Sequence, residues 1–394
     1  MRIVGRVVGR EGVQVVETEG SRIRSVAPRA EGAALEGDVL GGPEFMLAPA
    51  LLDVQVNGFA GHDFNRPDAG PEEAAAVVRA LGSAGVALCC PTVVTASFDH
   101  MAACLRAVNA ACADEAVAAA IPAVHVEGPC ISPDEGPRGA HPQDHVRPPE
   151  WDEFRRLQDA SGGRIGIVTL APELPGATAF IERLSEAGIV PAIGHTNASP
   201  ADVDRAVEAG ARLSTHLGNG SHALLPRHEN YIWRQMAEDR LWASVIPDGH
   251  HLPGYVLKCM IRGKQVARTI LVSDAVNIAG LPAGEYEFAG RPVVLTPAGK
   301  IQLKGTPFLA GSSLELARGV ANAVRLGEVS LAEAVRMATL NPARLLGIDD
   351  RYGSIEPGKD ADLLLFRWDE AAARIEVVRT ILQGRTVFEQ GNGR

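Results

Sequence analysis

The most constraining feature of this sequence is an alternation, repeated eight times, between short apolar segments and amphipathic segments. The amphipathic segments show the three-to-four-residue hydrophobic spacing of helices, whereas the apolar segments are typical of short buried strands. Strand-helix units in such a succession close into a parallel barrel. The sequence therefore predicts an α/β fold, a (β/α)8 TIM barrel, with strands at 50–56, 86–93, 121–127, 164–170, 189–195, 211–215, 241–248 and 269–274.

Helix start signals support this assignment. Ser199 with Asp202, and Ser330 with Glu333, have the spacing of capping boxes. The serine pair at 312–313 is typical of an N-cap at the start of a further helix. We expect helices at 72–84, 98–113, 151–158, 201–209, 255–262, 312–326 and 331–340.

Both ends of the chain are β-rich. The expected strands are 2–8, 13–17, 22–26, 361–367, 375–382 and 385–389. Two separate β-rich ends around a longer middle predict one small sandwich built from both termini. We therefore expect a β-sandwich domain of residues 1–48 and 350–394. The TIM-barrel catalytic domain would span 49–349, with a hairpin insert near 285–309.

Charge and composition exclude some classes of function. The net charge of -10 argues against nucleic acid as a partner, because phosphate backbones bind basic surfaces. It leaves room for a small anionic substrate, which a few local cations can bind. The N-terminal segment is interrupted by glycine and arginine, so we expect no signal peptide and no membrane anchor. The six cysteines form no CxxC pair, which favours free thiols and a cytoplasmic location.

Five ionisable side chains stand at or just after the C-terminal ends of predicted strands: Glu127, His195, His216, Asp248 and Asp274. Taken singly, each could be a buried histidine, a helix cap or a loop anchor. Barrel enzymes, however, build their active sites at this end of the strands. Two imidazoles and one carboxylate form an open site for one divalent metal ion, with a position left for water. Zinc suits these ligands best, and iron or another divalent ion is also compatible.

The motifs around these residues resemble a known family. They are His-Val-Glu-Gly-Pro (125–129), Gly-His-Thr-Asn-Ala (194–198), Thr-His-Leu-x-Asn (215–219), Asp-Gly-His-His (248–251), Ser-Asp-Ala (273–275), Leu-Ala-Gly-Ser-Ser (309–313), Met-Ala-Thr-x-Asn-Pro-Ala (337–343) and Gly-Lys-x-Ala-Asp-Leu (358–363). As a set, they resemble the N-acetylglucosamine-6-phosphate deacetylases of the amidohydrolase superfamily. The resemblance implies a metal-bearing barrel with a β-sandwich from both termini.

The same resemblance implies a role for each matching residue. Glu127, His195 and His216 would bind the metal, Asp274 would carry out acid-base catalysis, and His141 would meet the acyl carbonyl of the substrate. The substrate, an amino-sugar phosphate, would contact Ala140, His141, Asn219, Gly220, Arg227, His251 and Leu309. In related enzymes the arginine reaches across from a second subunit, which implies a homodimer.

The first barrel strand lacks the His-x-His pair with which many amidohydrolases bind a second metal. The corresponding residues here are Gln55 and Asn57. Amides are poor zinc ligands compared with imidazoles, so we expect a single metal ion.

The segment 218–230 departs from the family's usual pattern. It reads Gly-Asn-Gly-Ser-His and then Leu-Leu-Pro-Arg-His-Glu-Asn, where better-known members have Tyr-Asn-Ala-Met and an arginine followed by Glu-Pro-Gly. Arg227 keeps its spacing from His216, and its planar fork suits phosphate. The alternatives for Arg227 are a solvated loop side chain or an ion pair with Glu229.

The expected activity is hydrolysis of the acetamide of N-acetylglucosamine-6-phosphate, or of a close N-acyl amino-sugar phosphate, which gives the free amino sugar phosphate and acetate. Two alternatives stay open. The chain could be an amidohydrolase for a different amide, such as a cyclic amide or an N-acyl amino acid. It could also be a non-catalytic barrel homologue, since function resides in sites rather than in folds.

Overall fold

The computed structural model describes residues 1–30, 39–66, 68–288, 291–306 and 309–391. Parts of the predicted insert (289–290 and 307–308) and of the predicted terminal domain (31–38 and 392–394) lie outside the described residues. Among the helices of the described ranges, none has the length and apolar character needed to span a membrane.

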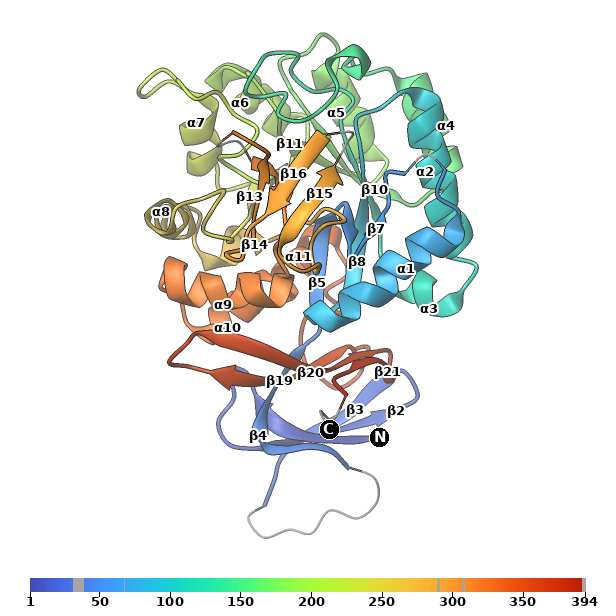
Figure 1. The fold of residues 1–394 in the computed structure, drawn as a ribbon, viewed down its shortest axis with the longest axis vertical. Coiled ribbons are helices and arrows are strands. Elements are labelled where there is room, and N and C mark those ends of the chain that lie inside the picture. The colour runs from blue at the N-terminus through green and yellow to red at the C-terminus, as the bar shows by residue number, and fades with distance from the viewer. Residues whose placement is uncertain (31–38, 67, 289–290, 307–308, 392–394) are drawn as a thin grey trace.

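The predicted barrel is confirmed (Figure 1). Its strands are β5 (Leu51–Val56), β8 (Val86–Val94), β9 (Val124–Glu127), β10 (Ile165–Leu170), β11 (Val190–Ile193), β12 (Leu213–Ser214), β13 (Trp242–Val245) and β14 (Thr269–Leu271). Neighbouring strands are parallel and follow one another in chain order. The last strand returns to the first through a hydrogen bond of 2.9 Å from the Asp274 N–H to the Gln55 carbonyl. The ring is therefore nearly closed.

Helices cover the outside of the barrel. They are α1 (Pro71–Leu81), α2 (Phe98–Ala111), α3 (Glu115–Ala120), α4 (Trp151–Ala160), α5 (Ala177–Glu186), α6 (Pro200–Glu208), α7 (Tyr231–Ala237), α8 (Gly254–Lys264), α9 (Leu316–Gly327), α10 (Leu331–Met337) and α11 (Leu340–Leu346). The capping boxes that start α6 and α10 are confirmed. The N-cap predicted at 312–313 is wrong, because Glu315 occupies the N-cap position of α9, without a capping hydrogen bond from its side chain. Ser312 instead bridges to Ala275 beside the barrel strands, and the Ser313 hydroxyl donates to the Gly299 carbonyl.

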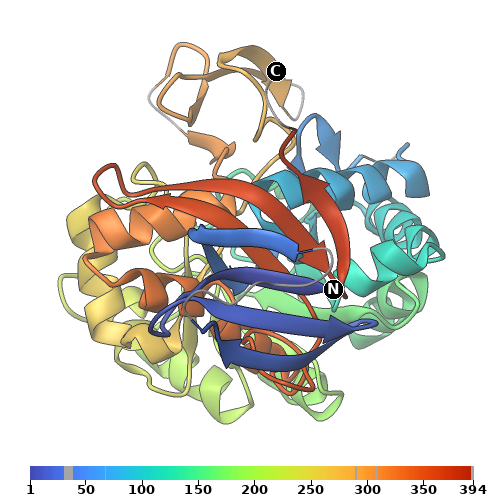
Figure 2. The same ribbon diagram turned by 90° about the horizontal axis from the view of Figure 1, so that it is seen from below.

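Strands from both termini form the accessory β-sandwich, which lies below the barrel in Figure 1 and faces the viewer in Figure 2. Its strands are β1 (Arg2–Val7), β2 (Gln14–Glu19), β3 (Arg22–Pro28), β4 (Val39–Pro49), β19 (Leu363–Asp369), β20 (Arg374–Leu382) and β21 (Arg385–Glu389). Strand β4, which the sequence did not predict, pairs with β1 on one side and with β19 on the other. It therefore joins the two termini. The domain boundaries at 48/49 and 349/350 stay predictions.

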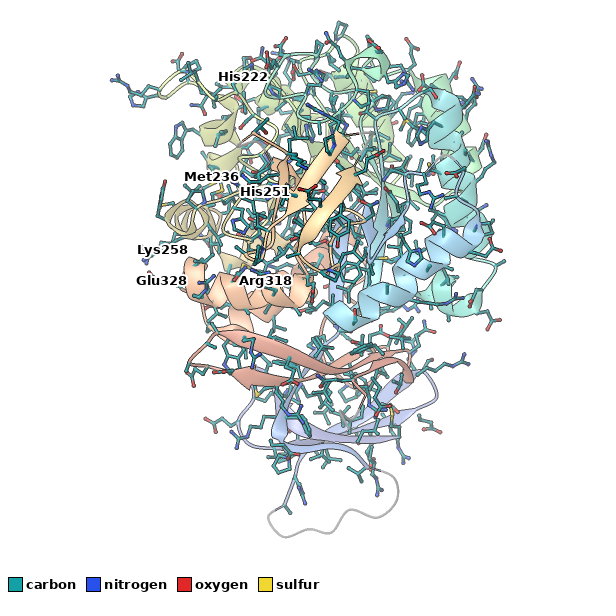
Figure 3. The ribbon with its side chains drawn as sticks, in the orientation of Figure 1. His222, Met236, His251, Lys258, Arg318 and Glu328 are labelled. Atoms are coloured by element: carbon teal, nitrogen blue, oxygen red, sulfur yellow. The ribbon has the colours of Figure 1, made fainter. Side chains whose placement is uncertain are left out.

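The insert after β14 is larger than the predicted hairpin. It contains four antiparallel strands: β15 (Gly284–Phe288), β16 (Arg291–Leu295), β17 (Lys300–Leu303) and β18 (Leu309–Ser312). Its turn is tied to the barrel, because the Ala298 carbonyl accepts hydrogen bonds from His250 Nε2 at 3.1 Å and from Arg318 Nη2 at 3.0 Å. Arg318 lies on α9 (Figure 3). The insert is thereby anchored beside the loop that carries residues 248–251.

Candidate active site

The five predicted strand-end residues lie at one end of the barrel. Glu127 is the last residue of β9, and His195 and His216 follow β11 and β12 by two residues. Asp248 and Asp274 follow β13 and β14 by three residues. Because all the strands are parallel, their C-terminal ends meet at the same face, so the side chains converge there as predicted.

Three of these residues adopt an unusual backbone conformation. The φ angles of His195, His216 and Asp274 are 52°, 30° and 47°. Non-glycine residues rarely adopt positive φ, which costs about 1 kcal/mol or more and persists where the surroundings enforce it. Here the His195 carbonyl accepts from the Ser132 N–H at 2.9 Å, and the Asp274 N–H donates to Gln55. The backbone is therefore strained just after β11, β12 and β14, at the three positions whose side chains meet in the site.

Three potential ligand atoms meet at the centre of this face. Glu127 Oε1 lies 3.2 Å from His195 Nε2 and 3.0 Å from His216 Nε2, and the two ring nitrogens are 3.0 Å apart. The side chains are 8% exposed or less. His195 Nδ1 lies 2.8 Å from the Pro137 carbonyl, which can only accept, so the proton is on Nδ1 and the lone pair of Nε2 faces the cluster.

This donor set fits a divalent metal ion. Ligand atoms arranged tetrahedrally around zinc at about 2.1 Å are about 3.4 Å from one another, close to the separations seen here. A buried carboxylate between two imidazoles also supplies one negative charge and two neutral donors, a combination common in catalytic metal sites.

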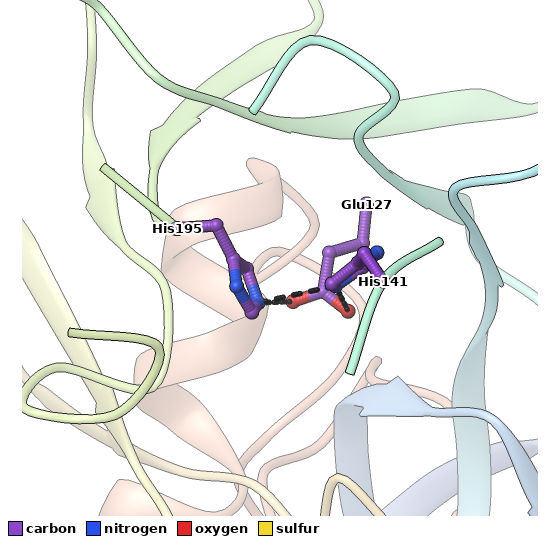
Figure 4. Close-up of side chains that lie close together, drawn as sticks. All are labelled: Glu127, His141 and His195. Carbon is purple, nitrogen blue, oxygen red and sulfur yellow. Dashed lines mark hydrogen bonds and ion pairs between the residues drawn. The ribbon is translucent and has the colours of Figure 1, made fainter. Parts of the chain in front are cut away.

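His141 reaches the same centre from the loop after β9. Its Nε2 lies 3.3 Å from His195 Nε2 and 4.0 Å from Glu127 Oε2, and Glu127, His141 and His195 form a group whose ligand atoms all lie within 4.8 Å (Figure 4). Burial lowers the pKa of His141 to about 3, so the ring is neutral. Its Nδ1 lies 2.8 Å from Thr95 Oγ1.

Thr95 was not identified from the sequence. It is the first residue after β8, so the same strand-end argument that found Glu127 could have found it. A single threonine at such a position carries little chemical signal, because a hydroxyl is equally common in turns.

Two amides, one at the end of the first barrel strand and one just after it, are hydrogen-bonded to the carboxylates of the site. Gln55 Nε2 donates to Glu127 Oε1 at 2.9 Å, and Asn57 Nδ2 donates to Asp274 Oδ1 at 2.8 Å. Burial, together with the negative charge of Glu127, raises the pKa of Asp274 to about 6. A carboxyl with such a pKa can both accept and release a proton near neutral pH.

The residues predicted to contact the substrate differ in how close they lie to the cluster. The Asn219 amide donates to the His216 carbonyl at 3.1 Å. Gly220 packs on the His195 ring so closely that a Cβ would lie 2.7 Å from Nδ1, and its φ is +54°. Ala140 is exposed in the loop that carries His141. Leu309 begins strand β18 of the insert.

Arg227 and His251 have different surroundings. Arg227 is exposed on the segment before α7, which projects from the barrel in Figure 1. Within the described part of the chain it has no ion-pair partner, so the alternative pairing with Glu229 is not observed. His251 is 11% exposed and lies 2.6 Å from Asp248 through its Nδ1.

Comparison with known proteins agrees with this geometry. Residues 46–387 match the amidohydrolase family. An N-acetylgalactosamine-6-phosphate deacetylase from Escherichia coli O157:H7 is 33% identical over 320 residues, which are 81% of this chain and 83% of that protein. An N-acetylglucosamine-6-phosphate deacetylase from Bacillus subtilis (strain 168) is 31% identical over 346 residues, covering 87% and 85% of the two chains.

Solved structures extend the similarity to the fold of the whole chain. The crystal structure of N-acetyl-D-glucosamine-6-phosphate deacetylase from Mycobacterium smegmatis has a TM-score of 0.87 and 27% sequence identity, and the match covers 98% of this chain and 100% of that one. The chain therefore belongs to the amidohydrolase superfamily and, within it, to the N-acetylglucosamine-6-phosphate deacetylase family.

Proposed function

We propose that this protein is a metal-dependent hydrolase that removes the acetyl group from N-acetylglucosamine-6-phosphate and releases the amino sugar phosphate and acetate. The observation that carries the proposal is the convergence of Glu127, His195, His216 and Asp274 at the C-terminal face of the barrel. A complete donor set beside a carboxyl suited to proton transfer argues against a non-catalytic barrel. The relatives named above are deacetylases of acetylated amino-sugar phosphates, which argues against cyclic amides and N-acyl amino acids.

We assign Glu127, His195 and His216 as ligands of one divalent ion, with zinc as the first choice. Such an ion lowers the pKa of bound water and polarises a carbonyl oxygen. Gln55 and Asn57 support a single ion, because their amide NH2 groups donate to Glu127 and Asp274 and so offer hydrogens rather than lone pairs there.

Asp274 moves the protons of the reaction. It accepts the proton of the attacking water through the oxygen that Asn57 does not bind, and returns it to the leaving nitrogen, since an amide anion is too basic to leave. His141 donates to the acyl oxygen from Nε2. With the proton of His141 on Nε2, Nδ1 must accept a hydrogen bond from the Thr95 hydroxyl. Thr95 Oγ1 lies 2.8 Å from His141 Nδ1 but 3.3 Å from the Glu127 carbonyl, its other possible acceptor, which agrees with this direction.

The remaining assignments concern the sugar and its phosphate. Ala140 and Leu309 contact the substrate, and Asn219, Gly220 and His251 bind its 6-phosphate from this subunit. The outward placement of Arg227 supports a homodimer in which it reaches the phosphate in the partner's site. Six free cysteines and a phosphorylated substrate support a cytoplasmic location.

A substrate panel tests the proposal. With purified, zinc-loaded protein, kcat/KM for N-acetylglucosamine-6-phosphate is expected to exceed that for N-acetylglucosamine by about a hundredfold or more, because charge-assisted hydrogen bonds to the phosphate are lost in the latter. The galactosamine epimer belongs in the panel, since one relative carries that name. Release of acetate from each sugar is the measurement. Equal rates with and without the phosphate would refute the proposal.

The pH dependence follows from Asp274, which acts as a base only when ionised. Its pKa is raised to about 6 by burial and by the charge of Glu127, and a bound cation opposes the second cause. We therefore expect kcat/KM to fall as the pH drops through about 6 or below. An acid limb centred above about pH 7 would contradict the assignment.

A further inference from the structure

Asp248 lies three residues after the seventh barrel strand, β13, and has no part in the chemistry described above. Its side chain is 7% exposed. Oδ1 accepts hydrogen bonds from the backbone N–H groups of His250 and His251, both at 2.8 Å, and Oδ2 lies 2.6 Å from His251 Nδ1. Burial alone would raise the pKa of this carboxyl, but the bonds from His251 and from the backbone hold the pKa below its usual value. Asp248 is therefore ionised, and its three hydrogen bonds hold both carboxylate oxygens in place.

A fixed carboxylate determines which nitrogen of His251 faces the substrate. A carboxylate can only accept, so Nδ1 of His251 must carry the proton that makes the 2.6 Å bond. Nε2 then lies on the opposite side of the ring, away from Asp248. The backbone bond from His251 to the same carboxylate also closes a short loop that limits rotation of the imidazole.

The charge of Asp248 also affects what Nε2 can bind. An imidazole paired with a carboxylate can hold a second proton with little electrostatic cost, and a doubly protonated ring donates from Nε2 as a cation. His251 lies close enough to Asp274 for its positive form to stabilise that carboxylate. The pair thus presents Nε2 of an 11% exposed imidazole on the side away from Asp248, where a proton on Nε2 would let the ring donate to an anionic ligand.

We propose that Asp248 is the positioning residue for phosphate selectivity: it orients His251 and supplies the negative partner with which the imidazole binds the 6-phosphate of the substrate as a cation. The inference rests on the proposed function. Asp248 does not contact the reacting atoms in this proposal, and it affects substrate binding only by positioning His251.

The test is the ratio of kcat/KM for N-acetylglucosamine-6-phosphate to that for N-acetylglucosamine in Asp248→Asn. Asparagine keeps an oxygen for the two backbone N–H groups, but its NH2 would face Nδ1, which turns the ring into the other neutral tautomer. The ratio is expected to fall at least about tenfold, with kcat/KM for the unphosphorylated sugar within about threefold of wild type. The inhibition constant of inorganic phosphate is expected to rise by a similar factor.

His250→Gln is the matched control. His250 is the neighbouring histidine, and its ring faces the Ala298 carbonyl of the insert rather than Asp248, so the ratio is expected to stay unchanged. The double variant Asp248→Asn with His251→Gln is expected to match His251→Gln alone, because residues that act through one another are not additive. If Asp248→Asn does not fold, Asp248→Glu, which keeps the charge, is expected to retain a higher ratio than His251→Gln.

The outcomes separate the two proposals. If wild type used the phosphorylated and the unphosphorylated sugar with equal kcat/KM, the proposed function itself would be refuted. A high wild-type ratio that Asp248→Asn leaves intact, or that falls only because both substrates lose rate equally, would overturn the role of Asp248 while leaving the deacetylase assignment in place. Additive effects of Asp248→Asn and His251→Gln on the ratio would overturn it as well.

Discussion

Replacing Asp274 by asparagine is expected to lower kcat/KM for the acetylated sugar phosphate by about a thousandfold or more, which corresponds to about 4 kcal/mol in the barrier. Asparagine can neither take a proton from water nor return one to the leaving nitrogen. The fold and the metal are expected to stay, because an amide oxygen at this position can still accept the hydrogen bond from Asn57. Burial disfavours the charged form of Asp274, so a neutral residue there does not destabilise the protein.

The measurement is single-turnover and steady-state acetate release, with zinc content and thermal unfolding recorded on the same sample. Asp362→Asn is the matched control. Asp362 is also a buried carboxyl whose pKa is raised, to about 7, but it accepts from the Gln383 N–H beside the terminal strands and is absent from the cluster. Activity of Asp274→Asn within about tenfold of wild type, about 1.4 kcal/mol, would remove Asp274 from its proposed role.

The sequence predicted the barrel because its strands are buried on both faces and therefore appear as uninterrupted apolar runs. The runs end where the barrel ends, so the polar residues that follow them had to meet at one face. This is why the order of residues along the chain is enough to group Glu127, His195, His216 and Asp274. The resemblance to deacetylases then supplied roles that position alone could not, such as that of His141.

Other features could not be predicted, for identifiable reasons. Strand β4 contains Gly41, Gly42 and Pro43, which are turn signals, and only its pairing with β1 and β19 makes it a strand. The serine at 312 has the chemistry of an N-cap, but tertiary bridging to Ala275 uses it in a strand. Local propensity is a weak guide wherever such long-range pairing is available.

The details of the site depend on long-range geometry in the same way. The positive φ angles of His195 and His216 could not be predicted locally, because histidine adopts positive φ more often than most residues but still only rarely. The contact between Thr95 and His141 joins residues 46 positions apart in the chain. By contrast, Asp248 and His251 are three residues apart, and an acidic residue with a histidine at that spacing after a strand is a signal that sequence reasoning could use in related barrels.

Replacing Glu127 by glutamine is expected to remove most of the metal and, with it, activity by about a hundredfold or more. Glu127 Oε1 accepts from Gln55 and faces both imidazoles, so the carboxylate supplies the only negative charge among the three proposed ligands. A neutral amide in its place binds a divalent ion much more weakly. Because two imidazoles remain, excess zinc is expected to restore part of the rate.

His125→Gln is the matched control for the loss of metal in Glu127→Gln. His125 lies two residues earlier on β9 and so points to the same side of the strand, and it is equally buried. It hydrogen-bonds to the Val54 carbonyl and to Thr169 Oγ1, and burial lowers its pKa to about 4, so it is a neutral structural histidine. Metal analysis is expected to find about one ion per chain in wild type and in His125→Gln, and far less in Glu127→Gln. Full metal content in Glu127→Gln would place the ion elsewhere, and two ions per chain at full activity would show that Gln55 and Asn57 do not limit the site to one.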